Sequence, residues 1–195
     1  MSKNILLAGM GGQGLVLMTD IICDAALNAD YDVKSNDVVG LSQRGGMVWG
    51  NVKIGNKIFS PNIEPSKGDF LIAMEPLEGY RWANILSESG KIIMNTKKIN
   101  PVIIQQENKK YPEKEIENLK EKYKIVKLNA FQKGVEFGTS KVANVILIGI
   151  LANNLNEKNI NINKEIWLES IFKYVPKKYK DINKKAFDYG FNYEK

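Results

Sequence analysis

The chain has 195 residues, of which 44% are hydrophobic, and a formal net charge of +6, so it is long and apolar enough to fold around its own core. It contains no histidine and a single cysteine, Cys23, which excludes histidine catalysis, an internal disulfide and a four-cysteine iron–sulfur cluster; we expect no metal site. Only Arg44 and Arg81 among the 28 basic residues are arginines, so the charge indicates a lysine-rich surface rather than a nucleic-acid site.

No segment combines the features of a signal peptide, and the longest apolar run, near residues 142–152, is too short to span a bilayer. We therefore expect a cytoplasmic protein with no membrane partner. The two arginines are of interest because lysine is the usual cation in this sequence. An arginine in that setting suggests a role for its planar, bidentate geometry.

The first quarter of the chain is predicted to form strands around one helix. Residues 5–8 form a short apolar strand, a glycine loop follows, and residues 15–28 have helical periodicity. The inward positions expected in this helix are Val16, Ile21, Ala25 and Leu27. Residues 31–39 and 47–54 are typical of strands, and "GNKI" at residues 55–58 predicts a hairpin turn.

The rest of the chain alternates in the same way. A buried strand is expected at residues 69–74, then a helix at 77–86 that begins with Pro76, and then a strand within residues 88–96. Gly90 is expected to end the helix. The later expected elements are a helix at 113–123, a strand at 124–128, a mostly helical stretch at 131–155, and helices at 164–174 and 177–189.

This alternation predicts an α/β fold with a Rossmann-like, mostly parallel sheet, helices on both faces and at least one antiparallel hairpin. We find no internal repeat and no convincing boundary in the Asn- and Lys-rich stretch at residues 153–163. We therefore expect a single domain over residues 1–195, with its C-terminal helices starting at about residue 163.

The first loop has the Gly-x-Gly-x-x-Gly spacing of dinucleotide-binding proteins, and its residues are Gly9, Gly11, Gly12, Gln13 and Gly14. Gly9 would permit a tight turn, the next two glycines would leave room for an anion, and Gly14 would let the helix pack closely on the sheet. Three interpretations stay open. The loop binds NAD or FAD, with Asp37 to hold the ribose; it serves packing alone; or it meets another anion or a partner subunit.

A second polar cluster lies in "GLSQRGG" at residues 40–46, and its candidate binding residues are Ser42, Gln43, Arg44, Gly45 and Gly46. The polar side chains could bind a phosphate or carboxylate, with the guanidinium acting as a bidentate donor. The alternative is a hairpin turn with an exposed arginine.

A third polar group follows the predicted strand at residues 69–74, where sites in α/β proteins often lie. It contains Glu75, Glu78 and Arg81. Because Glu78 and Arg81 are three residues apart on a predicted helix, we expect them to form a surface ion pair.

The two glycine-containing stretches together resemble the gamma-type domain of 2-oxoacid:ferredoxin oxidoreductases. The resemblance rests on "GMGGQG" at residues 9–14 and "GLSQRGG" at residues 40–46, and it covers most of the chain, from Lys3 to about Lys177. Further similar stretches are "DFLIAMEPLEGYR" at 69–81, "GKIIMNT" at 90–96 and "GTSKVANVILIGIL" at 138–151. The form "SQRGG" is most similar to the beta subunit of indolepyruvate ferredoxin oxidoreductases.

The resemblance implies a part in the oxidative decarboxylation of a 2-oxoacid, indolepyruvate or another arylpyruvate, which consumes coenzyme A and passes electrons to ferredoxin. Thiamine diphosphate and iron–sulfur clusters do that chemistry in the family. This chain lacks both the cysteine set and the thiamine-diphosphate signature, so the resemblance implies a non-catalytic subunit that has no catalytic residues of its own. It would pack on the catalytic subunit, with its two glycine-containing stretches near the coenzyme A route.

An apolar interface is also expected for such a subunit, and Trp49 and Trp82 are candidates to lie in it. Two other functions stay open: a stand-alone protein that binds NAD or FAD, and an adaptor module without an enzyme partner.

Overall fold

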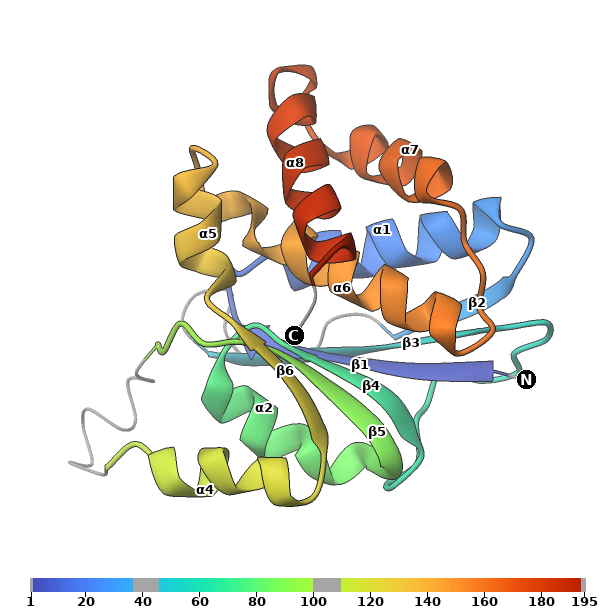
Figure 1. The fold of residues 1–195 in the computed structure, drawn as a ribbon. Helices are drawn as coiled ribbons and strands as arrows, with labels where there is room; N and C mark the ends of the chain where they lie inside the picture. Colours follow the sequence, from blue (N-terminus) through green and yellow to red (C-terminus); the bar gives the residue numbers. More distant parts are fainter. Residues whose placement is uncertain (1, 37–45, 100–109, 194–195) are drawn as a thin grey trace.

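A computed structural model describes residues 2–36, 46–99 and 110–193. Six strands form one sheet in the order β2-β3-β1-β4-β5-β6 (Figure 1). The strands are β1 (Ser2–Met10), β2 (Asp32–Ser35), β3 (Met47–Gly55), β4 (Gly68–Ala73), β5 (Leu86–Asn95) and β6 (Lys124–Leu128). Neighbouring strands from β1 to β6 are parallel, whereas β3 is antiparallel to both β1 and β2. The predicted mostly parallel sheet with an antiparallel pair is confirmed.

Helices cover both faces of the sheet, as predicted. In Figure 1, α2 (Pro76–Trp82) and α4 (Glu113–Asn118) lie on one face. The helices on the opposite face are α1 (Leu15–Asn28), α5 (Ala130–Glu136), α6 (Ala143–Glu157), α7 (Lys164–Tyr174) and α8 (Lys180–Phe191). Short 3₁₀ turns follow α2 and α4 and precede α6 and α8, at Ala83–Ile85, Leu119–Glu121, Ser140–Val142 and Lys177–Tyr179.

The sheet is buried on both sides because alternate strand residues enter two separate cores. Ile5 and Leu7 of β1 join the core beneath α1 and α6, whereas Leu6 and Ala8 join the smaller core beneath α2. This explains why the strand has an unbroken apolar sequence, as is usual for a central parallel strand. Trp167 of α7 is fully buried in the larger core.

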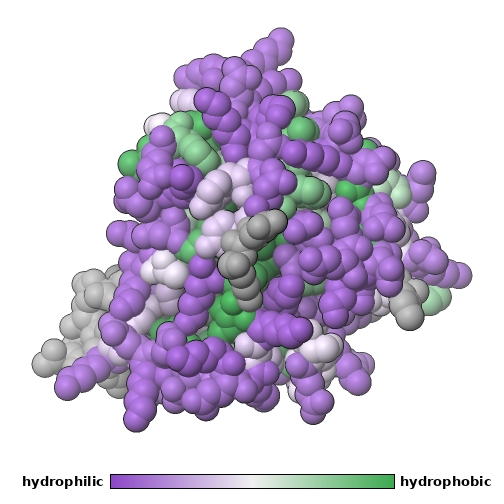
Figure 2. All heavy atoms as spheres, in the orientation of Figure 1, coloured by the Kyte–Doolittle hydropathy of each residue, from purple (hydrophilic) through white to green (hydrophobic). Residues whose placement is uncertain are grey.

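The two tryptophans expected at an interface pack together at the edge of the smaller core. Trp49 of β3 and Trp82 of α2 are each partly buried, and their ring centroids are 4.9 Å apart. The surface in Figure 2 is predominantly hydrophilic on the face shown, in keeping with the predicted lysine-rich surface. Within the described ranges, no helix has the length and apolarity needed to cross a membrane.

Three local predictions were wrong. The "GNKI" hairpin does not form, because β3 is already paired on both edges, with β1 and β2, and no edge is free for another strand. The following segment is instead held beside the sheet, where Ile58 N donates to Asp32 Oδ2 at 2.7 Å. Gly90 does not end a helix, because α2 ends at Trp82 and Gly90 already lies within β5.

The third error concerns the face of α1. Val16 and Leu27 are 59% and 57% exposed, although both were expected to face inward. The buried stripe instead includes Leu15, Met18 and Ile22, which recur at helical spacing from the first residue of the helix. The prediction of a single domain over residues 1–195, with its C-terminal helices from about residue 163, stays a prediction, although α7 begins at Lys164.

Candidate functional site

The candidate site lies where the direction of chain winding changes. After β1 the chain passes through α1 to β2, at one end of the strand order. After β4 it passes through α2 to β5, in the opposite direction along the strand order. The carboxyl ends of β1 and β4 therefore meet at a topological switch point, where ligands bind in open α/β sheets. The glycine loop follows β1 at this point, and Met74 follows β4.

The glycine loop leaves the first turn of α1 without a side-chain cap. Gly12 and Gly14 have φ angles of 94° and 79°, which glycine adopts without strain. Gly14 is the N-cap residue and has no side chain to accept a hydrogen bond from the first-turn amides of α1. A Cβ on Gly12 would meet nothing within 4 Å. These amides and the open space beside Gly12 suit an approaching anion.

Gly9 has a different role from the one predicted. It lies within β1, opposite Val48, and is not part of a turn. A Cβ on Gly9 would lie 2.7 Å from Gln13 Oε1 and 2.9 Å from Met74 Cβ. The absence of a side chain therefore allows the loop to fold back against β1 and β4.

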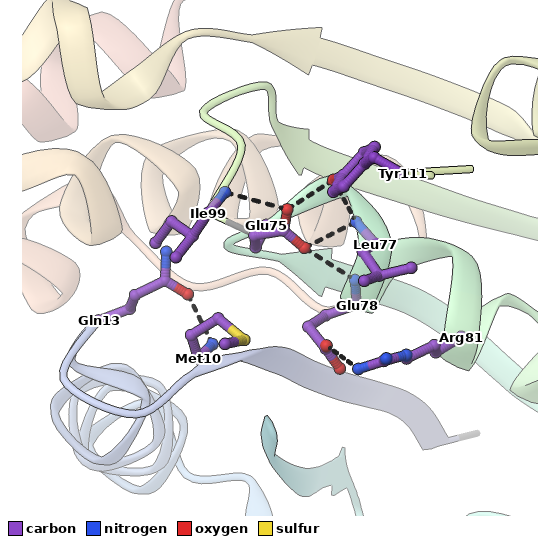
Figure 3. Close-up of polar contacts among 8 residues, drawn as sticks. All are labelled: Met10, Gln13, Glu75, Leu77, Glu78, Arg81, Ile99 and Tyr111. Atoms are coloured by element: carbon purple, nitrogen blue, oxygen red, sulfur yellow. Dashed lines mark hydrogen bonds and ion pairs between the residues drawn. The ribbon is translucent and has the colours of Figure 1, made fainter. Parts of the chain in front are cut away.

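Gln13 holds the loop in place. Its Oε1 accepts a hydrogen bond from Met10 N at 2.7 Å, and its Nε2 donates to Met74 O at 3.0 Å (Figure 3 draws the first of these). Asn95, at the end of β5, donates through Nδ2 to the same Met74 oxygen at 3.1 Å. Side chains thus connect the carboxyl ends of β1, β4 and β5, which fixes the floor of the site.

A cavity of about 380 Å³ opens above this floor. It is lined by Gly12 to Gly14, and by Lys97 and Lys141, both exposed cations on its rim. Asn144, at the start of α6, also lines the cavity and lies 2.8 Å, through Nδ2, from the position of a Cβ on Gly14. Two cations, two helix starts and an amide donor make this cavity suitable for a phosphate-bearing ligand.

The second predicted cluster falls only partly within the structure. Ser42, Gln43, Arg44 and Gly45 lie outside the described residues, as does Asp37, the candidate for binding ribose. Gly46 is described, and its carbonyl oxygen accepts a hydrogen bond from Gly11 N at 2.8 Å. The two glycine-containing stretches, 35 residues apart at these two positions, are thus in direct contact.

Glu75 organises the neighbouring polar cluster (Figure 3). Its Oε2 accepts hydrogen bonds from Leu77 N and Glu78 N, at 2.7 and 3.1 Å, and so caps α2. Its Oε1 accepts from Tyr111 Oη at 2.5 Å and from Ile99 N at 3.3 Å. Burial and the hydrogen bond to Glu75 raise the pKa of Tyr111, so the phenol stays protonated and donates.

Glu78 and Arg81 form the predicted ion pair, with Arg81 Nη1 2.6 Å from Glu78 Oε1, but it is not a surface pair. The Glu78 side chain is 0% exposed and that of Arg81 is 39% exposed. The second carboxylate oxygen of Glu78 has no hydrogen-bond partner within the described part of the chain. Burial raises the pKa of Glu78, although the charge of Arg81 and its hydrogen bond oppose the shift.

This pKa shift predicts a pH-dependent stability. A carboxyl whose pKa is raised on folding binds its proton more tightly in the native state, so its contribution to stability falls as pH rises from the ordinary value of 4.5. We expect the free energy of unfolding of Glu78→Gln to rise, relative to that of the unchanged chain, as the pH increases. Urea unfolding of both proteins from about pH 4 to about pH 7 measures this difference. Glu88→Gln, at an exposed position, is the control. A stability difference that stays constant over this range would contradict the assignment.

Sequence reasoning missed several residues that line the cavity, namely Asn95, Lys97, Lys141 and Asn144. All but Lys97 lie within the stretches "GKIIMNT" and "GTSKVANVILIGIL", which were used only to identify a resemblance. Their position directly after a strand or at a helix start was a usable signal, because the carboxyl ends of parallel strands gather at one edge of a sheet.

Comparison with known proteins confirms the predicted resemblance. A sequence model of the family described as pyruvate ferredoxin/flavodoxin oxidoreductase matches residues 4–193. The chain is 33% identical over 191 residues to indolepyruvate oxidoreductase subunit IorB of Pyrococcus horikoshii, covering 96% of this chain and 93% of the relative. It is also 33% identical over 195 residues to the subunit of the same name in Archaeoglobus fulgidus, covering 98% and 95%.

Solved structures share the fold. The gamma subunit of a keto/oxoacid ferredoxin oxidoreductase from Geobacter sulfurreducens superposes with a TM-score of 0.71 at 22% identity, over 97% of this chain and 96% of that one. The 2-oxoglutarate:ferredoxin oxidoreductase of Magnetococcus marinus, solved with 2-oxoglutarate, coenzyme A and succinyl-CoA, gives 0.74 at 17% identity, over 97% of this chain and 30% of that one.

Proposed function

The chain belongs to the pyruvate ferredoxin/flavodoxin oxidoreductase family, and from this premise we propose that it is the non-catalytic subunit of an indolepyruvate or arylpyruvate:ferredoxin oxidoreductase. The observation that carries the proposal is the match to indolepyruvate oxidoreductase subunits at 33% identity over 93% and 95% of their length. The "SQRGG" form of the second glycine-containing stretch supports the same substrate class. A cytoplasmic location and a single domain are parts of this proposal.

The proposed partner is a catalytic subunit that carries thiamine diphosphate and iron–sulfur clusters and reduces ferredoxin. This chain has one cysteine, whereas such a cluster takes about four cysteine ligands, so its own residues do not fit a cluster. We therefore assign no catalytic residue and no bound redox cofactor to this chain. Its contribution is to complete the complex and to shape the part of the site that receives coenzyme A.

The residues proposed to shape the coenzyme A site are Gly9, Gly11, Gly12, Gln13, Gly14, Ser42, Gln43, Arg44, Gly45 and Gly46. The cavity beside the loop supports this role, because its rim carries Lys97 and Lys141 and no side chain caps the first-turn amides of α1, which would attract an anion. The contact between Gly11 N and Gly46 O supports joint action of the two glycine-containing stretches.

The activity claim is tested by reconstitution. The catalytic subunit is produced alone and then mixed with this chain under anaerobic conditions, and ferredoxin reduction is followed with indolepyruvate, phenylpyruvate and pyruvate. The proposal predicts arylpyruvate-dependent reduction that requires this chain. Equal activity without the chain, or activity with pyruvate alone, would contradict it.

The coenzyme A claim is tested in the assembled complex with Arg44→Ala. Loss of a charge-assisted contact to a phosphate is expected to raise the KM for coenzyme A about tenfold, with little change in the KM for the 2-oxoacid. Lys57→Ala, which removes another exposed cation outside the lining of the cavity, is the control. An intact Arg44→Ala complex with an unchanged KM for coenzyme A would contradict the claim.

A further inference from the structure

The outer face of α1 carries apolar side chains where a surface helix ordinarily carries polar ones. Val16 and Leu27 are each more than half exposed, and Cys23 between them is half-buried. Together with Asp20, they recur at intervals of three or four residues, so the four side chains form one continuous line along the helix, which we call the α1 stripe. A contiguous exposed apolar surface of this kind marks a place where another molecule binds.

The composition of α1 supports the same conclusion. The chain has 28 basic residues, yet the interval between Lys3 and Lys34, which contains the whole of α1, has neither lysine nor arginine and is the longest such interval in the sequence. By contrast, α4, α5, α7 and α8 each carry at least one lysine, and α6, which carries none, is almost entirely buried. Because the buried centres of protein interfaces are depleted of lysine, α1 has the composition of an interface helix.

The position of the α1 stripe indicates which molecule covers it. Val16 is the second residue after Gly14, and the adjacent Leu17 lines the cavity beside the glycine loop. In the proposed function, a coenzyme A molecule in that cavity has to reach the catalytic subunit, so that subunit has to cover the surface next to the cavity. We propose that the α1 stripe is the surface on which the catalytic subunit docks. This inference rests on the proposed function and adds to it the helix face that meets the partner.

The charges of α1 define the chemistry of the partner surface. Asp20 and Asp24 are the only charged residues of the helix. Asp24 is buried and paired with Lys173 of α7, whereas Asp20 lies on the stripe and has no ion pair within the described part of the chain. The complementary surface is therefore apolar, with a lysine or arginine opposite Asp20. A second copy of this chain is less suitable, because two-fold pairing through α1 would bring two Asp20 carboxylates into one small interface.

The test measures the Kd between the full chain and the separately produced catalytic subunit under anaerobic conditions. Leu27→Lys is the principal variant, because Leu27 lies at the end of α1 away from the cavity and lysine is the usual surface cation of this sequence. We expect this change to raise the Kd at least about tenfold. Val135→Lys, which changes a similarly exposed valine of α5, should leave the Kd unchanged. Thermal unfolding of each isolated variant separates loss of docking from loss of folding.

The cation expected opposite Asp20 is tested by the salt dependence of binding. Asp20→Asn keeps the size of the side chain and removes its charge. We expect its Kd to change less than that of the unchanged chain between about 50 mM and about 500 mM salt, because salt screens an ion pair that this variant lacks. Asp181→Asn, at an exposed position of α8, should keep the original salt dependence. The same salt dependence for Asp20→Asn and the unchanged chain would overturn the assignment of a cation to the partner.

The other outcomes separate this inference from the proposed function. If the unchanged chain does not bind the catalytic subunit, both fail. If it binds and Leu27→Lys binds as tightly, α1 is not the docking surface, while the proposed function still stands. If Leu27→Lys and Val135→Lys weaken binding equally, the effect is not specific to α1 and the inference is overturned. If the isolated chain forms a dimer that Leu27→Lys dissociates, with binding to the catalytic subunit unchanged, a second copy covers the stripe instead.

Discussion

Replacing Gly190 with alanine is expected to lower the free energy of unfolding by about 3 kcal/mol or more, as overpacking of a tight interior does. Gly190 of α8 lies where this helix crosses α6, and a Cβ there would overlap the carbonyl oxygen of Ile146. The opposing residue is Gly149, where a Cβ would lie 2.5 Å from Phe187 O. The obstacles are backbone atoms, so no side-chain rotation relieves the overlap and the two helices would have to separate.

The sign of this effect distinguishes packing from helix propensity. At an open helical position, alanine is more favourable than glycine by about 1 kcal/mol. Packing therefore has to outweigh a gain from propensity. Urea unfolding of Gly190→Ala and of Lys185→Ala, an exposed change on the same helix, makes the comparison. An unfolding midpoint of Gly190→Ala equal to or above that of the unchanged chain would mean that α6 and α8 do not cross as described.

Replacing Glu75 with alanine is expected to cost about 3 kcal/mol, because the change leaves buried donors without an acceptor. The carboxylate is 0% exposed and accepts hydrogen bonds from Leu77 N, Glu78 N, Ile99 N and Tyr111 Oη. Loss of this carboxylate removes the cap of α2 and the hydrogen bonds that connect this helix to Ile99 and Tyr111. Glu115→Ala, on the exposed side of α4, should change stability by less than about 0.5 kcal/mol.

A double-mutant cycle with Tyr111→Phe measures the link itself. The phenol donates to Glu75, and it also accepts from Leu77 N at 3.0 Å. Because the two side chains share these partners, the effects of Glu75→Ala and Tyr111→Phe should be less than additive. Strict additivity in urea unfolding would show that the two side chains do not interact.

Elements with a strong local pattern could be predicted from the sequence. The strand at Lys124–Leu128 and the helix at Lys164–Tyr174 have the predicted bounds, because hydrophobic period and turn residues determine them locally. The "GNKI" hairpin failed for a non-local reason. A glycine and an asparagine after a strand favour a turn, but whether a hairpin follows depends on a free strand edge, and β1 and β2 occupy both edges of β3.

The candidate site shows the same division. The spacing of the glycines predicted a loop after the first strand, whereas Gln13 was included only as part of the stretch "GMGGQG". The burial of Glu78 could not be predicted from the sequence. A spacing of three residues predicts an ion pair with Arg81, but it does not show which side of α2 faces the sheet. Asn144 reaches Gly14 from 130 residues further along the chain, through the packing of α6 beside α1. No local pattern contains that contact.

Anaerobic co-purification from native cells tests whether this chain works as one subunit of an enzyme complex. We expect the chain to purify with a brown partner that contains iron–sulfur clusters and thiamine diphosphate, and the complex to reduce ferredoxin when an arylpyruvate is supplied. A colourless chain that purifies alone, from cells in which such a partner is present and active without it, would show that the chain is not a subunit of that enzyme.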